Sequence, residues 1–326
     1  MQSVLGIDVS KDKLDVVLVS DMRSIHKIFS NNAIGHQRLQ SWLIAQRVGR
    51  VHACLEATGQ YGEAVAEHLY GSGQLVSVVN PARIKKYGES KLHRNKTDKA
   101  DAALIAEFCQ KEKPPFWSPL AVEVKQLRAL VRRLDDLQAN YQQERNRMLA
   151  GERDAWVLDD LQAHLDYLQE RIRAARQAIQ KHVEQYPNLK SQQDLLISIP
   201  GIGKLTAARL LAEIGDFSAF EDAPQLAAFA GLNPKIKLSG SSVYKKPRIS
   251  KEGRANLRAF LYMPAIVARK HNPIIREFCA RLSERKLPEM AIVIAAMRKL
   301  LHIIYGVLKN RLPFDPNFGK QFAFTP

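Results

Sequence analysis

Residues 4–9, VLGIDV, form a short apolar run that contains a single acid, Asp8. A run of this length is typical of a buried strand. The polar turn at residues 11–13, followed by a β-branched run at residues 14–20, predicts a hairpin. A carboxylate in a buried strand loses its hydration unless a positive partner compensates it. Asp8 is therefore hard to explain by structure alone.

Short strands and helices are predicted to alternate after this hairpin. The apolar pattern predicts helices over residues 38–46 and 62–70 and strands over residues 51–55 and 75–79. The Asn-Pro pair at residues 80–81 predicts a turn. Such alternation is typical of a layered α/β domain, and the Pro-rich stretch at residues 113–115 predicts its end. We therefore expect an α/β domain over residues 1–115.

The middle of the chain is predicted to be long helix. Apolar residues recur at alternating spacings of three and four over residues 120–141 and again over residues 158–179, with a polar break at residues 151–154. This spacing predicts a coiled-coil segment over residues 116–188. Two such helices pack either on each other as a hairpin or on another subunit, and the spacing does not decide between these alternatives.

The last part of the chain, residues 189–326, is predicted to be a mostly helical domain. A polar, Gly/Ser-rich stretch interrupts the helices at residues 233–252. Residues 291–308 are the most apolar late stretch, but they contain Arg298, Lys299 and His302. These charges are incompatible with a membrane span, so a buried helix is predicted there.

The net charge indicates the class of partner. The chain has 49 Lys and Arg against 33 Asp and Glu, which gives +16 at pH 7. A field of this sign favours polyanions, either nucleic acid or an anionic membrane surface. The first ten residues lack the basic and apolar regions of a signal peptide. We therefore expect a nucleic-acid partner and no membrane.

The cysteines and histidines predict no metal or disulfide framework. Cys54, Cys109 and Cys279 are far apart and form no Cys-x-x-Cys pair, and the nine histidines show no ligand spacing. Each cysteine is predicted to be a small core residue in a reducing cytosol.

Three further acids complete a possible metal site with Asp8. Glu56 follows a predicted strand, and Asp98 and Asp101 follow Thr97, a possible helix cap. Asp98 and Asp101 are three residues apart, so they share a helix face. Alone, Asp98 and Asp101 are equally well explained as stabilising a helix N-terminus, and Glu56 alone is better explained as a surface charge at a strand end. Together, the four acids supply the hard oxygen ligands that two Mg²⁺ or Mn²⁺ ions need in phosphoryl transfer.

The sequence motifs around these acids resemble those of one family. The motifs are GIDVSK at residues 6–11, EATGQY at 56–61, NP at 80–81 and RNKTDKAD at 94–101. They are similar to those of the DEDD-type insertion-sequence transposases, the group that contains the Piv DNA invertases and the RNA-guided bridge recombinases. The resemblance implies an RNase H-like domain of the Holliday-junction-resolvase form. It also implies catalytic and metal-binding roles for Asp8, Glu56, Asp98 and Asp101, and the basic residues Arg94 and Lys96 are expected to bind nucleic acid.

Residues 199–203, IPGIG, precede a helical pattern at residues 204–214. This arrangement predicts a helix-hairpin-helix, in which glycines let backbone N–H groups approach a phosphate at a helix N-terminus. Gly201, Gly203 and Lys204 are the expected contacts. A tight turn between two core helices is the competing interpretation.

A serine-rich stretch, SGSS at residues 239–242, lies beside a basic flank. Spacing alone favours a polar loop whose flank grips phosphate through Lys245, Lys246, Arg248, Lys251 and Arg254. The same stretch, with ISKEG at residues 249–253, LR at 257–258 and LY at 261–262, resembles the second domain of the family. That resemblance implies Ser239 as the catalytic serine, with Ser241 and Ser242 as alternatives.

The resemblance implies a transposase or site-specific recombinase of a mobile insertion sequence, acting through a phosphoserine and guided by a noncoding bridge RNA. A serine hydroxyl needs activation by a metal or a base. The phosphoserine retains the phosphoester energy, so no nucleotide cofactor is expected, and no GxxxxGK[ST] loop occurs. A protein-only invertase and a hydrolytic Holliday-junction-type nuclease remain open. The implied partners are donor DNA, target DNA, guide RNA and further copies of the chain as a dimer or tetramer, in the bacterial cytoplasm at the nucleoid.

Overall fold

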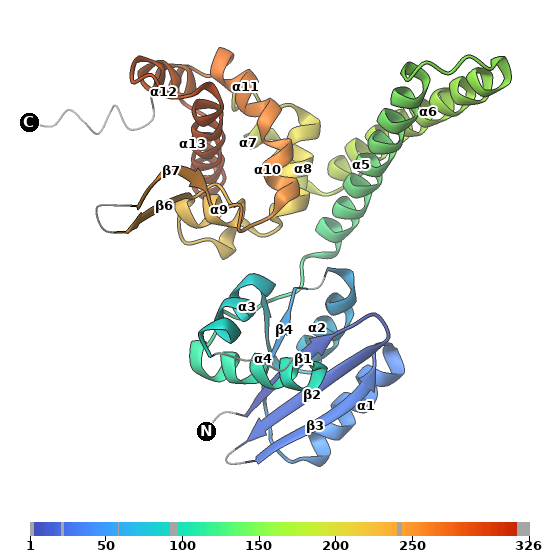
Figure 1. Cartoon of the computed structure of the whole chain (residues 1–326), viewed down its shortest axis with the longest axis vertical. Coiled ribbons are helices and arrows are strands. Elements are labelled where there is room, and N and C mark those ends of the chain that lie inside the picture. Colours follow the sequence, from blue (N-terminus) through green and yellow to red (C-terminus); the bar gives the residue numbers. More distant parts are fainter. Residues whose placement is uncertain (1–2, 21–22, 58, 92–96, 240–242, 318–326) are drawn as a thin grey trace, which may run out of the picture. The chain divides into compact units, whose positions relative to one another are not determined.

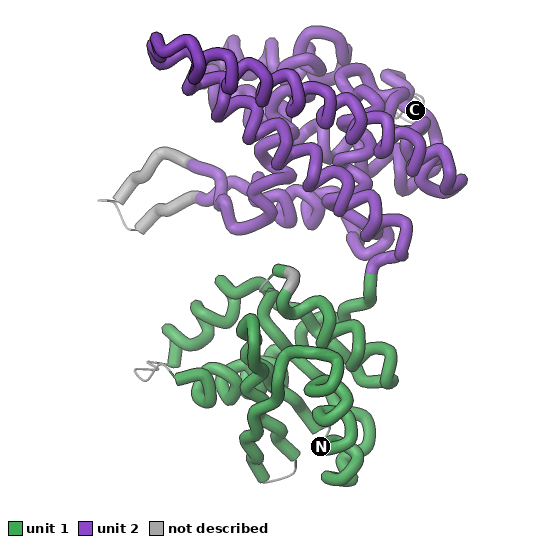
Figure 2. Tube along the Cα trace, turned by 90° about the vertical axis from the view of Figure 1, so that its right-hand side faces the viewer, with its two compact units in different colours: residues 1–119 green, residues 120–326 purple. Residues whose placement is uncertain are grey.

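The computed structural model describes residues 3–20, 23–57, 59–91, 97–239 and 243–317, with the side chains of residues 60 and 236–247 outside the description. The chain forms two compact units, residues 1–119 and residues 120–326 (Figure 2). The three-domain division predicted from the sequence stays a proposal.

The first unit is built on one mixed sheet of five strands in the order β3-β2-β1-β4-β5 (Figure 1). Its strands are β1 (Val4–Val9), β2 (Lys13–Ser20), β3 (Arg23–Ser30), β4 (His52–Glu56) and β5 (Leu75–Val79). The first three strands are antiparallel, and β4 and β5 run parallel to β1 and to each other. This order and these directions are those of an RNase H-like fold, so the predicted fold class of the N-terminal unit is confirmed.

Helices cover both faces of this sheet. Leu5, Ile7 and their neighbours pack with α1 (Ala33–Ala45) and α2 (Gln60–Gly71) in one buried cluster. Val4 and Cys54 pack on the other face with α3 (Pro81–Ser90) and α4 (Asp98–Glu112). The two faces follow from the strand period of two, because successive side chains point to opposite sides.

Helix α3 corrects the turn predicted at residues 80–81. Asn80 caps the helix, since its Oδ1 accepts a hydrogen bond from the Ala82 amide at 2.9 Å, and Pro81 is the first helical residue. Proline suits this position because its missing N–H has no intrahelical partner there. Strand β3 was also not predicted. It is an edge strand with mostly exposed or half-buried side chains, so its sequence lacks the apolar run of a buried strand.

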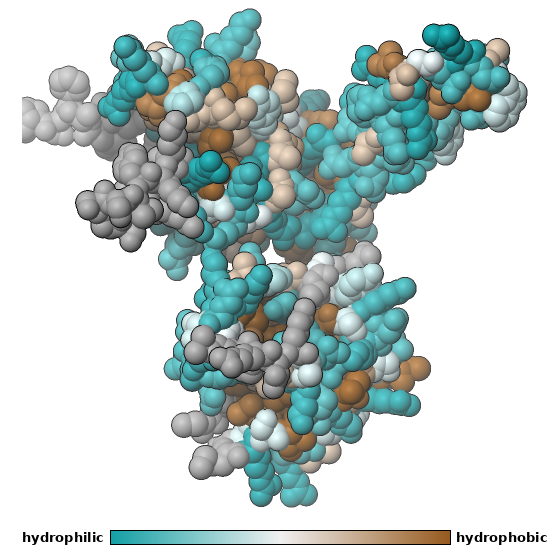
Figure 3. All heavy atoms as spheres, in the orientation of Figure 1, coloured by the Kyte–Doolittle hydropathy of each residue, from teal (hydrophilic) through white to brown (hydrophobic). Residues whose placement is uncertain are grey.

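The second unit begins with two long helices, α5 (Val122–Leu149) and α6 (Ala155–Gln185), which pack on each other as a hairpin (Figure 1). The face visible in Figure 3 is largely hydrophilic along this pair. The apolar spacing predicted the packed stripe: Leu127, Val131, Leu165 and Leu168 are buried. The intramolecular alternative is therefore the one found, while coiled-coil geometry stays a prediction.

The remaining helices pack with α5 and α6 in one buried core. They are α7 (Pro187–Ile197), α8 (Lys204–Ile214), α9 (Ala223–Phe229), α10 (Ala255–Phe260), α11 (Tyr262–His271), α12 (Pro273–Glu284) and α13 (Glu289–Asn310), with the 3₁₀ turn η1 (Phe217–Ala219). By length and composition α13 is apolar enough to cross a membrane, but it packs with α11, α12 and α9, and half of its apolar window is buried. It is the buried helix expected at residues 291–308.

The polar stretch predicted to interrupt these helices is not a loop throughout. It forms an antiparallel hairpin of β6 (Pro234–Ser239) and β7 (Val243–Ile249), with an irregularity between Lys235 and Lys237. The strand-favouring residues Val243, Tyr244 and Ile249 of β7 were outweighed in the sequence by the neighbouring Gly, Ser and Lys residues.

Candidate active site

The sheet brings two of the predicted acids side by side. Strands β1 and β4 are parallel with Ile7 opposite Leu55, so the next residues along, Asp8 and Glu56, lie at adjacent strand ends. Both share the face of Val4 and Cys54, which α4 covers. Each side chain is half-buried.

Helix α4 brings the other two acids to the same face. Thr97 caps it, with Oγ1 accepting from the Ala100 amide at 3.2 Å, as the sequence predicted. Asp98 and Asp101 lie in its first turn. The helix can lie close to β1 only because residue 6 is glycine: a Cβ there would stand 2.2 Å from the Ala102 carbonyl oxygen and 2.4 Å from the Ala106 amide nitrogen.

The negative charges of the four acids act on one another. Burial raises the pKa of the Asp8 carboxyl, and the negative charges of Asp101, Asp98 and Asp15 raise this pKa further. Burial likewise raises the pKa of Glu56, with further contributions from Asp8 and Asp101. Carboxylates held together in a half-buried place repel one another, and a bound cation would reduce that repulsion.

The donor set of the four acids fits a divalent metal ion. Among the described residues, no three His, Cys, Asp or Glu side chains converge closely enough to hold an ion. The four acids nevertheless supply only hard carboxylate oxygens, which suit Mg²⁺ or Mn²⁺. They lie at two strand ends and in the first turn of one helix, and their charges oppose one another. Asp8, Glu56, Asp98 and Asp101 are thus the residues that would hold the ion.

Sequence reasoning missed three residues beside the acids. Lys13 Nζ lies 2.5 Å from Asp98 Oδ2 and 3.1 Å from Asp15 Oδ2. Asp15 is buried, and its Oδ1 lies 2.9 Å from His26 Nε2. Lys13 and Asp15 alternate with apolar residues at the start of β2, which is a signal that both face one side of the sheet.

The predicted serine lies in the second unit, apart in sequence from the acids. Ser239 is the last residue of β6 and pairs with Val243 of β7. Ser241 and Ser242 lie outside the described residues, as do Arg94 and Lys96 of the first unit.

Backbone contacts fix the base of this hairpin. The Ser250 amide donates to the Asn233 carbonyl at 2.8 Å, and the Arg254 amide donates to the Phe229 carbonyl at the same distance. A Cβ on Gly253 would stand 2.5 Å from both the Gly231 amide nitrogen and the Phe229 carbonyl oxygen, so only glycine allows this approach.

The basic residues beside the hairpin differ in their contacts. Lys245 and Lys246 lie in β7, with their side chains outside the description, and Arg248 and Lys251 are exposed. Arg254 instead lies 3.4 Å from the buried carboxylate of Glu213 and stacks over the Phe229 ring at 5.0 Å. The charge of Arg254 is thus partly neutralised by Glu213 of the same unit.

The turn between α7 and α8 has two different glycines. Gly201 has φ +106°, and a Cβ there would lie 2.8 Å from the Ala268 Cβ of α11, so it faces the core. Gly203 and Lys204 are exposed, and Gly203 precedes α8 as its N-cap without a side-chain hydrogen bond. A helix that starts at exposed residues suits an anion, because its first amides have no intrahelical partner. Phosphate binding here stays a prediction.

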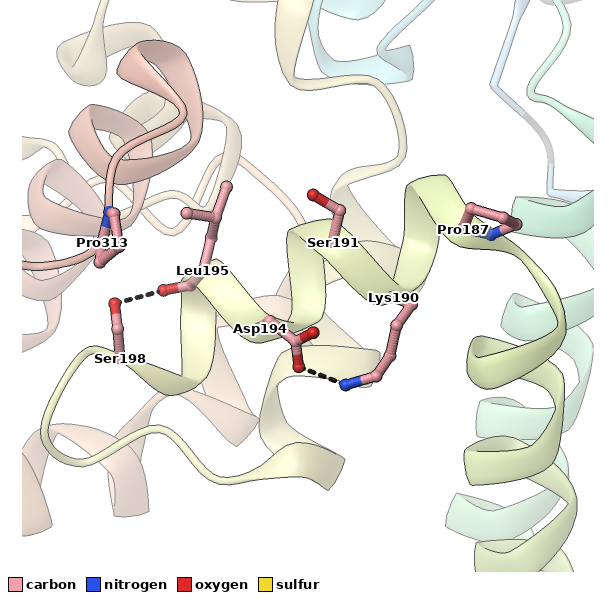
Figure 4. A pocket seen from close by; sticks show the side chains of 7 residues that line it. All are labelled: Pro187, Lys190, Ser191, Asp194, Leu195, Ser198 and Pro313. Atoms are coloured by element: carbon pink, nitrogen blue, oxygen red, sulfur yellow. Dashed lines mark hydrogen bonds and ion pairs between the residues drawn. The ribbon is translucent and has the colours of Figure 1, made fainter.

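A surface hollow lies elsewhere in the second unit, between α7 and the segment after α13 (Figure 4). Three of its polar side chains are paired within the unit: Lys190 with Asp194, and Ser198 with the Leu195 carbonyl at 2.6 Å. None of the predicted site residues lines it.

Comparison with known proteins identifies the family. A model described as "Transposase IS116/IS110/IS902 family" matches residues 193–280, and a DEDD model of IS110 type, described as "Transposase", matches residues 5–151. A pilin gene-inverting protein of Moraxella bovis is 34% identical over 317 residues, which cover 96% of this chain and 98% of that protein. The chain belongs to the IS110 family of transposases.

One further relative and one solved structure are similar to this chain. The IS110-family chain is 26% identical over 300 residues to the transposase for insertion sequence element IS1111A of Coxiella burnetii, covering 82% of this chain and 78% of that protein. Among solved structures, RuvC of T. thermophilus in complex with a Holliday junction substrate aligns at 16% identity with a TM-score of 0.27, covering 34% of this chain and 96% of that chain. The fold assignment rests on the strand order of this chain.

Proposed function

We propose that this IS110-family chain is a recombinase of a mobile insertion sequence, which cuts and rejoins DNA through a phosphoserine intermediate. The observation that supports it most is the gathering of Asp8, Glu56, Asp98 and Asp101 on one face of an RNase H-like sheet. The net charge of +16 suits donor and target DNA as partners. The proposed location is the bacterial cytoplasm, at the nucleoid.

The four acids have one proposed role. Mg²⁺ or Mn²⁺ bound by them would stabilise the charge that develops on the scissile phosphate. The residues themselves hold fixed oxygen ligands at the end of a rigid sheet, which preserves the geometry through the reaction. No nucleotide cofactor is required.

Ser239 is the proposed nucleophile. Its hydroxyl oxygen bonds to phosphorus, the bond between phosphorus and a sugar oxygen breaks, and the hydroxyl proton passes to a base while the leaving oxygen gains a proton. A sugar hydroxyl of another strand then displaces the serine, so the number of phosphoester bonds is conserved and no ATP is needed. The start of α8 at the exposed residue Gly203 and the exposed cations Arg248 and Lys251 are proposed to hold the DNA backbone.

The acids and the serine lie in separate units of the chain. Recombination handles several strands, so we propose a dimer or tetramer in which the active site forms either within one chain or between subunits.

A denaturing gel of labelled DNA tests the serine. The wild type is expected to give a protein–DNA adduct that survives denaturation, and Ser239→Ala is expected to lose it while DNA binding persists. Ser241→Ala and Ser242→Ala are the matched controls and are expected to keep the adduct. An adduct lost only in a control moves the nucleophile to that serine. Cut ends without adduct in every variant would refute the covalent step and favour a hydrolytic nuclease that uses water.

Two modes of target choice share this chemistry. Guidance by a noncoding bridge RNA is our first proposal, because the charge of +16 exceeds what one short duplex contact needs. A protein-only DNA invertase is the second, favoured by the 34% identity to the pilin gene-inverting protein over nearly the whole chain. Sequencing the nucleic acid that co-purifies with protein expressed with its flanking DNA separates them. One discrete RNA supports guidance, and random host fragments support the invertase.

A further inference from the structure

Lys13 brings a positive charge into direct contact with the acid cluster. It starts β2, and its ammonium nitrogen lies 2.5 Å from Asp98 Oδ2, on α4, and 3.1 Å from Asp15 Oδ2, on its own strand. Its side chain is 45% exposed, so solvent and ions reach it. One ammonium thus bridges a proposed metal ligand and a second carboxylate outside the ligand set.

The second carboxylate is fixed in the sheet. Asp15 is 3% exposed, and its other oxygen lies 2.9 Å from His26 Nε2 on β3. Asp15 also stands directly opposite Asp8 in the antiparallel β1–β2 pair, so both side chains lie on the same face. Asp15 therefore holds Lys13 at the edge of the acid cluster, whether or not Lys13 also contacts Asp98.

The contact between Lys13 and Asp98 opposes the binding of a metal ion by Asp98. An ammonium at 2.5 Å uses a carboxylate oxygen that a metal ion would need. If the ion displaces it, Asp15 still keeps the positive charge within a few ångströms of a dication, and like charges at that distance repel.

We propose that Lys13 is an internal cation that competes with the divalent metal for Asp98 and lowers the affinity of the acid cluster for the ion. This inference rests on the metal site of the proposed function. Lys13 neutralises part of the cluster when no metal is bound, and it moves from Asp98 to Asp15 alone when metal arrives. Asp15 and His26 are positioning residues for that movement.

Mn²⁺ binding to the metal-free, full-length protein tests the proposal, measured by titration calorimetry and by the electron paramagnetic resonance signal of free Mn²⁺. Lys13→Met, which keeps the chain length but removes the charge, is expected to bind Mn²⁺ about tenfold more tightly than the wild type. Lys13→Gln repeats the test in a second background in case Lys13→Met folds poorly. Lys13→Arg keeps the charge and is expected to bind like the wild type.

Two controls separate the possible failures. Lys11→Met removes the same charge from an exposed lysine of the same turn and is expected to leave the affinity within about twofold of the wild type. Asp8→Asn is expected to abolish binding. Equal or weaker binding by both Lys13→Met and Lys13→Gln, with Asp8→Asn still defective, overturns the role of Lys13 but keeps the metal site. A wild type that binds no Mn²⁺, or binding unaffected by Asp8→Asn, overturns both.

Discussion

Gly6→Ala perturbs the acid cluster without touching an acid. Gly6 lies in β1 two residues before Asp8, and its missing Cβ allows α4 to lie against the strand. The added methyl group would meet the Ala102 carbonyl oxygen at 2.2 Å and the Ala106 amide nitrogen at 2.4 Å. Both are backbone atoms of a helix, so no side-chain rotation relieves the clash.

The size of the effect follows from these distances. Ordinary contact begins at 3.4 Å, so α4 must retreat by about 1 Å, and Asp98 and Asp101 move with it. Overpacking of this kind costs about 3 kcal/mol, the upper end of the usual range, because backbone must shift. A displacement of about 1 Å in a catalytic group lowers the rate by about 100-fold.

Urea unfolding and DNA strand cleavage are measured on the same preparations. Gly88→Ala is the matched control, because Gly88 of α3 also faces α4 but meets only the end of the flexible Leu104 side chain, at 2.9 Å. It is expected to remain close to the wild type in stability and cleavage. Gly6→Ala with wild-type stability and cleavage would refute the reasoning that this close approach positions the α4 acids.

Two further predictions concern charge and backbone. Because the pKa values of Asp8 and Glu56 are raised in the folded protein, their contribution to stability is fully present below the unfolded values of 3.8 and 4.5 and is lost as pH rises through the folded values. Unfolding in EDTA across pH 4–7 should therefore show a smaller pH-dependent loss in Asp8→Asn than in the wild type, and equal slopes would contradict the assignment. In the second unit, Gly201→Ala should lower the free energy of unfolding by at least about 1 kcal/mol, because φ is +106° and the new Cβ meets Ala268. Gly203→Ala, which meets no atom within 4 Å, should stay within about 1 kcal/mol of the wild type, and thermal unfolding that ranks the two in the opposite order would show that the turn is not packed as described.

The candidate site could be predicted in part from the sequence, because the residues next to its acids are informative. Asp8 interrupts an apolar strand, and Asp98 and Asp101 share the first turn of a helix that begins after a threonine cap. Both signals are local, since they depend on neighbours within a few residues. The β6–β7 hairpin was less visible, because Gly, Ser and Lys residues dominate its composition and favour a loop.

The sequence by itself determined the local elements whose periodicity is strong. Strands at residues 4–9 and 75–79 and the helix at residues 204–214 have the bounds that the apolar pattern predicted. The buried stripes of α5 and α6 also follow from spacing alone, because side chains three and four apart share a helix face.

Only the tertiary structure decided which distant residues meet. The parallel register of β1 and β4 sets Asp8 beside Glu56, and the antiparallel register with β2 sets Asp15 opposite Asp8. Lys13 reaches Asp98 across 85 residues of sequence. Register and helix docking depend on the packing of whole faces, and a shift of one residue would turn every side chain of a strand to the other side of the sheet.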